Sequence, residues 1–211
     1  MPLHRNTPRV GIILLAAGSS SRMKGRDKLV EEVWGTPLLR HSAIQALESR
    51  ADKVTVILRP DDQPRRDTLE GLAVTIIENP RHGEGMASSI RAGLGAMSDM
   101  DGAIIALADM PDITARSHDR LIDAFSETPD RIIRAATPEG RPANPVLFPQ
   151  RLFDELARLS GDKGARDLLR RSNARPRLIT LPGSGVDLDT EEDWQDWLAQ
   201  TVSVDDRSSD S

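Results

Sequence analysis

Short apolar runs alternate along the chain with longer segments of helical periodicity. The runs are nearly continuous, as in VGIILL at 10–15 and GAIIALA at 102–108, a pattern typical of strands buried on both faces of a parallel sheet. Strands and helices that alternate in this way predict an α/β fold: one three-layer α/β/α domain with a mostly parallel sheet. The predicted strands are 10–15, 53–58, 73–78, 102–108, 132–137 and 145–148, and the predicted helices are 36–50, 61–71, 85–98, 115–127, 149–158, 163–172 and 190–200.

The pattern also sets the expected domain organisation. The chain has 211 residues and no linker rich in Pro, Gly or Ser, which suits a single domain. We expect a flexible N-terminal tail at 1–9, the domain at 10–200, and a disordered acidic tail at 201–211 (TVSVDDRSSDS).

Composition narrows the possible functions. The chain has no cysteine, which excludes disulfides, thiolate metal sites and a cysteine nucleophile. The net charge of −5 and the scarcity of aromatic residues argue against a nucleic-acid partner. No apolar run approaches the ~18 residues of a membrane span, so we expect no membrane partner and a cytoplasmic protein.

One short stretch concentrates positive charge directly after the first predicted strand. In LLAAGSSSRMKGRDK (14–28), small residues at the strand end precede Arg22, Lys24, Arg26 and Lys28. Ligands of parallel sheets bind at the carboxyl ends of strands, and backbone N–H groups of small residues can point at phosphate oxygens there. Arg22 as a fork and Lys28 as a point charge would then hold a polyphosphate. A solvated basic loop is the alternative from spacing alone. Neither GxxxxGK[ST] nor GxGxxG follows the strand, so a P-loop kinase or a dinucleotide dehydrogenase is disfavoured.

Carboxylates mark two further places. Asp109 in IIALADMPDI comes just after a buried strand, where a carboxylate is costly unless it is paired or binds a cation. Mg²⁺ prefers one or two carboxylates together with water and substrate phosphates, so Asp109 is a candidate metal ligand; a turn cap is the alternative. Asp187 and Asp189 in GVDLDTEEDW would face the same side of an extended strand, and Thr190 would cap the last helix.

These motifs together resemble a known family. LLAAGSSSRMKGRDKL followed by GTPLL resembles L-x-A-G-x-S-x-R-M-G-x-x-K-L and G-x-P-L-L of nucleotidyltransferases that use a nucleoside triphosphate and release pyrophosphate. This chain carries one extra residue, Lys24. Four later segments are also similar to family motifs: 79–93, LADMP, 140–149 and SGDKGAR. Within the superfamily, the resemblance is to molybdenum cofactor cytidylyltransferases.

The resemblance implies a Rossmann-like fold of the nucleotide-diphospho-sugar transferase type, Mg²⁺ as cofactor, and roles for particular residues. Arg22, Lys28 and Asp109 would be catalytic, and Asp109, with Asp187 or Asp189, would meet the metal. Asn144 stands, after Ala143, where the family has Gly-His. The remaining implied residues bind the nucleotide (Leu15, Ala16, Ala17, Gly18, Gly85, Ser88, Ser89) or the acceptor (Asn144, Asp162, Arg166).

The leading hypothesis is transfer of a nucleoside monophosphate from CTP to molybdenum cofactor. Guanylyl-transferring relatives typically read L-A-G-G where this chain has Leu15-Ala16-Ala17-Gly18, which favours cytosine over guanine. One alternative is a sugar or polyol phosphate as acceptor. Another is a non-catalytic factor that binds molybdenum cofactor and delivers it to a molybdoenzyme.

Overall fold

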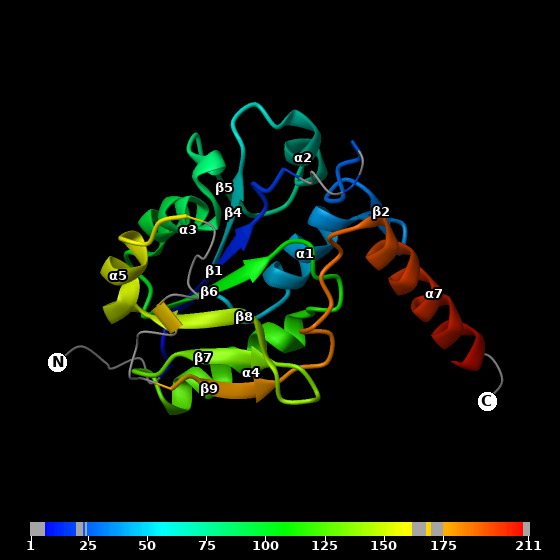
Figure 1. Cartoon of the computed structure of the whole chain (residues 1–211). Coiled ribbons are helices and arrows are strands. Elements are labelled where there is room, and N and C mark those ends of the chain that lie inside the picture. Colours follow the sequence, from blue (N-terminus) through cyan, green and yellow to red (C-terminus); the bar gives the residue numbers. More distant parts are fainter. Residues whose placement is uncertain (1–6, 20–22, 24, 162–167, 170–174, 209–211) are drawn as a thin grey trace.

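The computed structural model describes residues 7–19, 23, 25–161, 168–169 and 175–208. Its centre is a seven-stranded sheet in the order β5-β4-β1-β6-β8-β7-β9 (Figure 1). The pairs β5/β4, β4/β1, β1/β6 and β7/β9 are parallel, whereas β8 is antiparallel to both of its neighbours. The strands are β1 (Val10–Leu15), β4 (Lys53–Leu58), β5 (Thr75–Glu78), β6 (Gly102–Leu107), β7 (Ile133–Ala136), β8 (Pro142–Pro149) and β9 (Arg177–Thr180).

Helices cover both faces of this sheet. The helix α3 packs against β1, β4 and β5 and against α5, while α1 and α4 contact each other and the sheet on the other face. The predicted three-layer, mostly parallel α/β fold is therefore confirmed. The helices are α1 (Leu38–Leu47), α2 (Gln63–Thr68), α3 (Met86–Leu94), α4 (Ala115–Glu127), α5 (Phe153–Ala157) and α7 (Glu191–Ser208), with short 3₁₀ turns at His82–Glu84, Gly95–Met97 and Gln150–Leu152.

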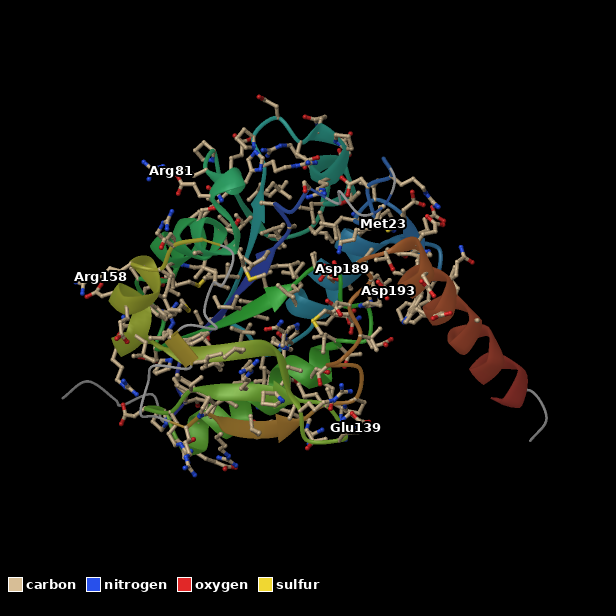
Figure 2. The ribbon with its side chains drawn as sticks, in the orientation of Figure 1. Met23, Arg81, Glu139, Arg158, Asp189 and Asp193 are labelled. Atoms are coloured by element: carbon tan, nitrogen blue, oxygen red, sulfur yellow. The ribbon has the colours of Figure 1, made fainter. Side chains whose placement is uncertain are left out.

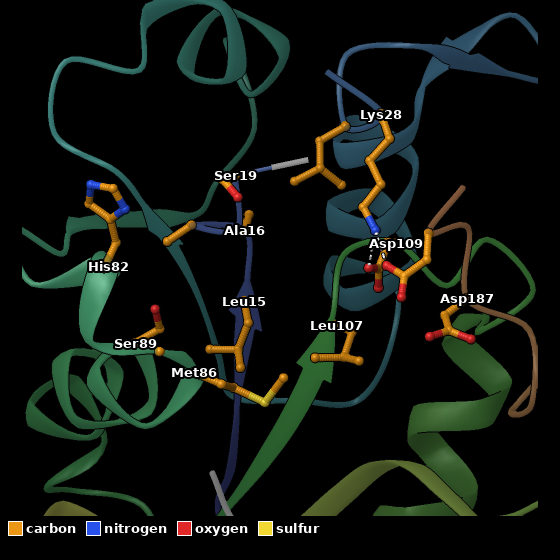
Figure 3. Close-up of a pocket in the computed structure, with 16 residues that line it drawn as sticks. Leu15, Ala16, Ser19, Lys28, His82, Met86, Ser89, Leu107, Asp109 and Asp187 are labelled. Atoms are coloured by element: carbon orange, nitrogen blue, oxygen red, sulfur yellow. Dashed lines mark hydrogen bonds and ion pairs between the residues drawn. The ribbon is translucent and has the colours of Figure 1, made fainter. Parts of the chain in front are cut away.

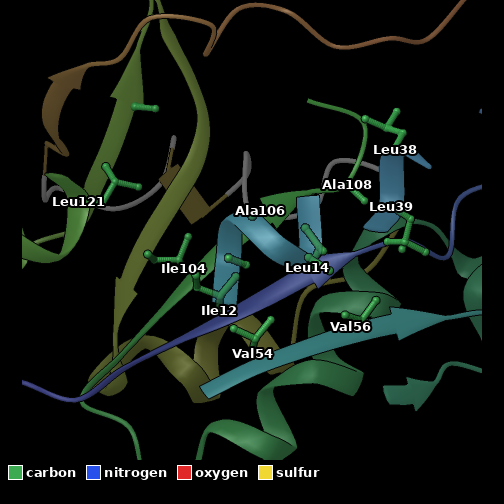
Figure 4. Packing of buried hydrophobic residues seen from close by; sticks show 14 of the residues in the cluster. Ile12, Leu14, Leu38, Leu39, Val54, Val56, Ile104, Ala106, Ala108 and Leu121 are labelled. Atoms are coloured by element: carbon green, nitrogen blue, oxygen red, sulfur yellow. The ribbon is translucent and has the colours of Figure 1, made fainter. Parts of the chain in front are cut away.

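The apolar side chains of the strands belong to two hydrophobic cores, one on each face of the sheet. Successive side chains of a strand point to opposite faces, so Ile12 and Leu14 of β1 join the core beneath α1 and α4, and Ile13 joins the core beneath α3 and α5. Figure 4 shows the first core, in which Val54 and Val56 of β4 lie beside β1. Burial on both faces explains why these strands read as continuous apolar runs.

Several boundaries differ from the sequence prediction. The hairpin of β2 (Glu32–Val33) and β3 (Thr36–Pro37) and the strand β9 were not predicted. The helix α7 continues to Ser208, so it covers most of the segment predicted to be a disordered tail. Residues 1–6 of the predicted N-terminal tail, and most of the helix predicted at 163–172, lie outside the described residues. No helix in the described part of the chain is long and apolar enough to cross a membrane.

Candidate active site

A cavity of about 620 Å³ opens where the carboxyl ends of β1 and β6 lie side by side. Leu15 and Leu107, the last residues of the two strands, are register partners and both line it. In the sheet, β1 lies between β4 on one side and β6 on the other, and the chain continues from β1 to β4. This is a topological switch point, the place where open α/β sheets bind ligands. The wall consists of Leu15–Ser19, Lys28, Leu29, His82, Gly83, Gly85, Met86, Ser89, Leu107, Asp109, Asp187 and Asp189.

Lys28 lies between two carboxylates in this cavity. Its Nζ donates to Asp109 Oδ2 at 2.6 Å (Figure 3), and it also donates to Asp189 Oδ1 at 2.7 Å. The three residues come from the loop after β1, the end of β6 and the segment before α7. Lys28 is only 8% exposed, so these charge-assisted hydrogen bonds form in a partly desolvated place, where they are stronger than in water.

The cluster shifts the pKa values of its members. Burial by itself lowers the pKa of Lys28, but the charges and hydrogen bonds of Asp109 and Asp189 outweigh it, so the pKa is raised and the ammonium stays charged. For Asp187, in contrast, the surroundings disfavour the charged form of the side chain. Its pKa is raised, first by burial and then by the negative charges of Asp189 and Asp109. Among the described lining residues, the carboxylates thus carry more negative charge than Lys28 neutralises.

Local hydrogen bonds hold the C-terminal acidic segment against β6. The N–H of Leu188 donates to the carbonyl of Asp109 at 3.0 Å, which ties the segment to the strand end. Asp193 Oδ2 accepts from the N–H of Asp189 at 3.2 Å and from the N–H of Thr190 at 2.7 Å, and Thr190 Oγ1 accepts from the N–H of Asp193. Figure 2 shows Asp189 and Asp193 together at the start of α7. This reciprocal cap is the structural reason for the TEED sequence.

The carboxylates offer donors for a cation without forming a ready-made metal cage. Asp109 Oδ1 is buried and has no hydrogen-bond partner among the described residues, although such an oxygen is costly to leave unpaired. Within the described part of the chain, however, no three His, Cys, Asp or Glu residues are arranged to hold a metal ion. The donor set therefore fits an ion that takes one or two carboxylates and completes its shell with water and substrate oxygens.

The opposite wall is built by the segment that leads into α3. The side-chain amide of Asn79 donates to Ser88 Oγ at 2.8 Å and to Ser89 Oγ at 3.1 Å, and Ser88 Oγ donates to the carbonyl of Gly85 at 2.8 Å. Of the two serines, Ser89 lines the cavity. Gly85 adopts φ 91°, a conformation that favours glycine, and this turn places its backbone in the wall.

The structure brings most of the predicted residues to this cavity. Leu15, Ala16, Ala17, Gly18, Lys28, Gly85, Ser89, Asp109, Asp187 and Asp189 all line it. Among the described residues, Ser88 and Asn144 are not part of its wall: Ser88 braces the turn at Gly85, and Asn144 lies within β8. Arg22, Asp162 and Arg166 lie outside the described residues.

Sequence reasoning missed one buried ion pair and part of the cavity wall, namely Ser19, Leu29, His82, Gly83, Met86 and Leu107. His82 and Met86 line the cavity, and Met86 is 41% exposed. Both residues lie inside the 79–93 segment that resembles a family motif, and this position could have predicted their place in the site. Arg65 is fully buried and paired with Asp27. A charged residue in a polar helix pattern predicts solvent exposure, so nothing in the sequence indicated this pair.

Residues 12–176 match the model of the MobA-like NTP transferase domain. The chain belongs to this family. The match spans the elements from β1 to the segment before β9, and it confirms the predicted nucleotidyltransferase superfamily and reaction class, whereas the cytidylyl donor stays a prediction. The protein is an NTP-using nucleotidyltransferase with a Rossmann-like fold.

Proteins similar to this chain carry diverse names. Nicotine blue oxidoreductase of Paenarthrobacter nicotinovorans is 30% identical over 199 residues, covering 88% of this chain and 94% of that protein. A probable molybdenum cofactor guanylyltransferase of Natronomonas pharaonis is 38% identical over 104 residues, 49% of this chain and 50% of that protein. The crystal structure of Rv0371c of Mycobacterium tuberculosis matches with a TM-score of 0.77 at 26% identity, covering 90% of this chain and 98% of that one. A second structure of Rv0371c is a complex with manganese and matches with a TM-score of 0.72 at 25% identity, covering 90% and 97%.

Proposed function

We propose that this nucleotidyltransferase moves a cytidylyl group from CTP to the phosphate of molybdenum cofactor and releases pyrophosphate. The observation that carries the proposal is the Lys28–Asp109–Asp189 cluster near the carboxyl end of β1, inside a cavity large enough for a nucleotide. A buried lysine beside carboxylates, at the end of a small-residue loop, suits a ligand that has both phosphates and a bound cation.

The nucleotide lies across the cavity from the β1 loop to α3. Its phosphates face the backbone of Ala16, Ala17 and Gly18, where N–H groups would donate to them. Lys28, with Arg22 from the same loop, supplies full positive charge. The base faces the wall made by Gly85 and Ser89, with the hydroxyl of Ser89 as a polar contact, while Ser88 supports the turn.

The reaction is an in-line displacement at the α-phosphorus. An oxygen of the acceptor phosphate forms the new P–O bond, and the bond from the α-phosphorus to the bridging oxygen of the β-phosphate breaks, so that pyrophosphate leaves with the electron pair. No covalent enzyme intermediate is needed. Transfers of this kind depend on positioning and on charge stabilisation, so Lys28 and Arg22 act by holding the triphosphate and neutralising charge on the leaving pyrophosphate.

Asp109 and Asp187 or Asp189 would hold the divalent cation, and we propose Mg²⁺. Two features fit it: the buried Asp109 Oδ1, which has no hydrogen-bond partner among the residues that the structure describes, and the raised pKa of Asp187, caused first by burial and then by the neighbouring carboxylates. When bound, such an ion supplies Lewis-acid polarisation of phosphate oxygens and a template for their orientation. The manganese complex of Rv0371c, a structural neighbour of this chain, supports the proposal of a divalent ion.

The acceptor would approach from the side of β8, the strand that carries Asn144. Asn144, Asp162 and Arg166 remain the proposed acceptor contacts. The guanylyltransferase relative supports molybdenum cofactor as acceptor. The choice of CTP over GTP rests on Ala17, whose methyl group leaves less room near the turn than glycine would. A molybdoenzyme that receives the product is the corresponding protein partner.

The test is product identification. The protein is incubated with equal concentrations of CTP and GTP, a divalent ion and molybdenum cofactor, and the dinucleotide products are separated and identified by mass spectrometry. The proposal predicts mainly the cytidylyl product, because a steric or polar mismatch of this size is worth roughly 1–3 kcal/mol. Mainly guanylyl product would overturn the base assignment, and no joined product with either nucleotide would overturn the acceptor.

A sugar or polyol phosphate is the second candidate acceptor. It is favoured by the replacement of the family's Gly-His by Ala143-Asn144, and by relatives named bifunctional protein GlmU, one of which is 32% identical over 136 residues covering 30% of its length. Pyrophosphate release with a sugar phosphate, but not with molybdenum cofactor, would favour this candidate.

A further inference from the structure

A buried arginine joins the two ends of the loop that leads from β1 to Lys28, defined here as the signature loop (residues 16–28). Arg65 of α2 is fully buried. Its Nε donates to Asp27 Oδ2 at 2.7 Å and its Nη2 to Asp27 Oδ1 at 2.8 Å, a fork-on-carboxylate pair. Its Nη1 donates to the carbonyl of Ala16 at 2.6 Å.

We propose that Arg65 is a positioning residue for the triphosphate site: by holding Ala16 and Asp27 together it fixes the two ends of the signature loop and aims Lys28 into the cavity. The proposal rests on the function proposed above. Both ends that Arg65 holds adjoin the ligand site, because Ala16 is itself part of the cavity wall and Asp27 directly precedes Lys28.

The surroundings of Arg65 explain how a buried charge is tolerated there. Asp62 Oδ2 lies 3.4 Å from Arg65 Nε and also accepts from Arg59 at 2.9 Å, so two arginines and two aspartates balance. Asp27 in turn orders its own turn, since its Oδ1 accepts from the N–H of Leu29 at 3.2 Å and its carbonyl from the N–H of Val30 at 3.0 Å. The guanidinium thus holds a hydrogen-bonded turn, and its loss would leave a partly buried carboxylate without its fork.

The geometry of the fork makes the role sensitive to chemistry rather than to charge alone. A lysine at position 65 would keep the positive charge, yet a single ammonium cannot present the planar fork that meets both oxygens of Asp27 and the carbonyl of Ala16. Loosening either contact frees one end of the signature loop. The Lys28 side chain then spends less time at the place where the β- and γ-phosphates of the nucleotide lie.

The experiment compares CTP and CMP binding by titration calorimetry in Arg65→Lys, Asp27→Asn and the wild type, with thermal unfolding of each protein. Arg66→Lys is the matched control, because Arg66 is the next residue of α2 and pairs at the surface with Glu78, away from the signature loop. We expect Arg65→Lys to weaken CTP binding about ten- to hundredfold, the equivalent of one or two charge-assisted hydrogen bonds. CMP binding should change far less, and Arg66→Lys should resemble the wild type.

Asp27→Asn separates positioning from simple electrostatics. It removes a negative charge beside a polyphosphate site, so long-range electrostatics predicts tighter CTP binding, whereas positioning predicts weaker binding. Equal losses of CTP and CMP affinity, losses that follow the melting temperature, or tighter CTP binding by Asp27→Asn would overturn the proposal. Should Arg65→Lys fail to fold, Asp27→Asn decides the question alone. A wild-type protein that binds no nucleoside triphosphate would instead overturn the proposed function.

Discussion

At the scale of single residues, Lys28 has two sets of possible partners. In this structure its amino group is held by Asp109 and Asp189, while the proposed function requires it to bind phosphate and requires the carboxylates to bind a cation. Lys28 therefore occupies the place where a divalent ion would neutralise the same carboxylates. A ligand that carries both phosphates and a cation satisfies all three side chains at once.

Replacing Lys28 by methionine should consequently have opposite effects on two ligands. We expect Lys28→Met to bind Mn²⁺ alone more tightly, by about tenfold, because no ammonium competes for the carboxylates, and to bind CTP more weakly than CMP relative to the wild type. Electron paramagnetic resonance titration of Mn²⁺ without nucleotide, and calorimetry with each nucleotide, measure the two effects. Arg26→Met is the control of equal charge change, since Arg26 pairs with Glu31 and Glu191. Unchanged or weaker Mn²⁺ binding by Lys28→Met would refute the competition.

His118 predicts a pH dependence of stability. It is buried in α4, and its Nδ1 has no partner among the described residues. Burial lowers its pKa from the usual 6.5 to about 4, against the raising effect of Asp119. A lowered histidine pKa means that the unfolded chain binds the proton first, so its stabilising contribution is complete above pH 6.5 and is lost as the pH falls towards 4.

The expected loss from this residue is about 2 kcal/mol between pH 7 and pH 5. Urea unfolding of the wild type and of His118→Leu at both pH values isolates it from the carboxylates, which both proteins share. The free energy of unfolding of the wild type should fall relative to that of the variant. Parallel pH dependences would show that His118 does not titrate as described.

At the scale of elements, the acidic segment before α7 is positioned by close packing as well as by hydrogen bonds. Gly183, in the turn after β9, has φ 76°, and a methyl group added there would overlap Cβ of Asp112. Asp112 follows Asp109 in the loop after β6, so this contact presses the turn leading to Asp187 against the loop that carries Asp109. The contact between Gly183 and Asp112 therefore helps to position the two acidic segments relative to each other, although neither residue carries the site carboxylates.

Gly183→Ala should damage this arrangement, and Gly140→Ala is its matched control. Gly140 has φ 81° but open space where a methyl group would be added, so its substitution costs only the backbone strain of about 1 kcal/mol. Overlap with Asp112 should add roughly 1–3 kcal/mol in Gly183→Ala and should lower turnover as well. Urea unfolding and pyrophosphate release measure the two effects. Equal destabilisation by the two variants, with equal turnover, would show that the Gly183 contact does not matter.

At the scale of the whole molecule, the sequence predicts the elements whose environment repeats a simple period. The strands β1 and β4 and the helix α4 have the predicted bounds, because strands buried on both faces and a strongly amphipathic helix each leave a clear pattern. The hairpin β2–β3 has two residues in each strand, too few for a period. In β9 the side chains are half-buried or exposed, so its sequence has no apolar run that would predict a strand.

The candidate site divides in the same way. Lys28, Asp109 and the pair Asp187 and Asp189 were predictable because each stands at a strand end or in a recognisable motif. The ion pairs of Lys28, the bracing role of Ser88 and the buried fork of Arg65 on Asp27 depend on segments that only the folded chain brings together. Contacts between side chains that lie tens of residues apart in the sequence leave no periodic pattern, so only the folded structure reveals them.

The most direct test of the central claim is pyrophosphate release by the wild type and by Asp109→Asn, measured with CTP, molybdenum cofactor and a divalent ion. The amide preserves shape but removes the charge beside Lys28, and unchanged thermal unfolding would establish that the fold is intact. We expect release that depends on the divalent ion in the wild type and a fall in turnover on the order of 10²–10³ in the variant. Near wild-type, metal-dependent release by a folded Asp109→Asn would contradict it.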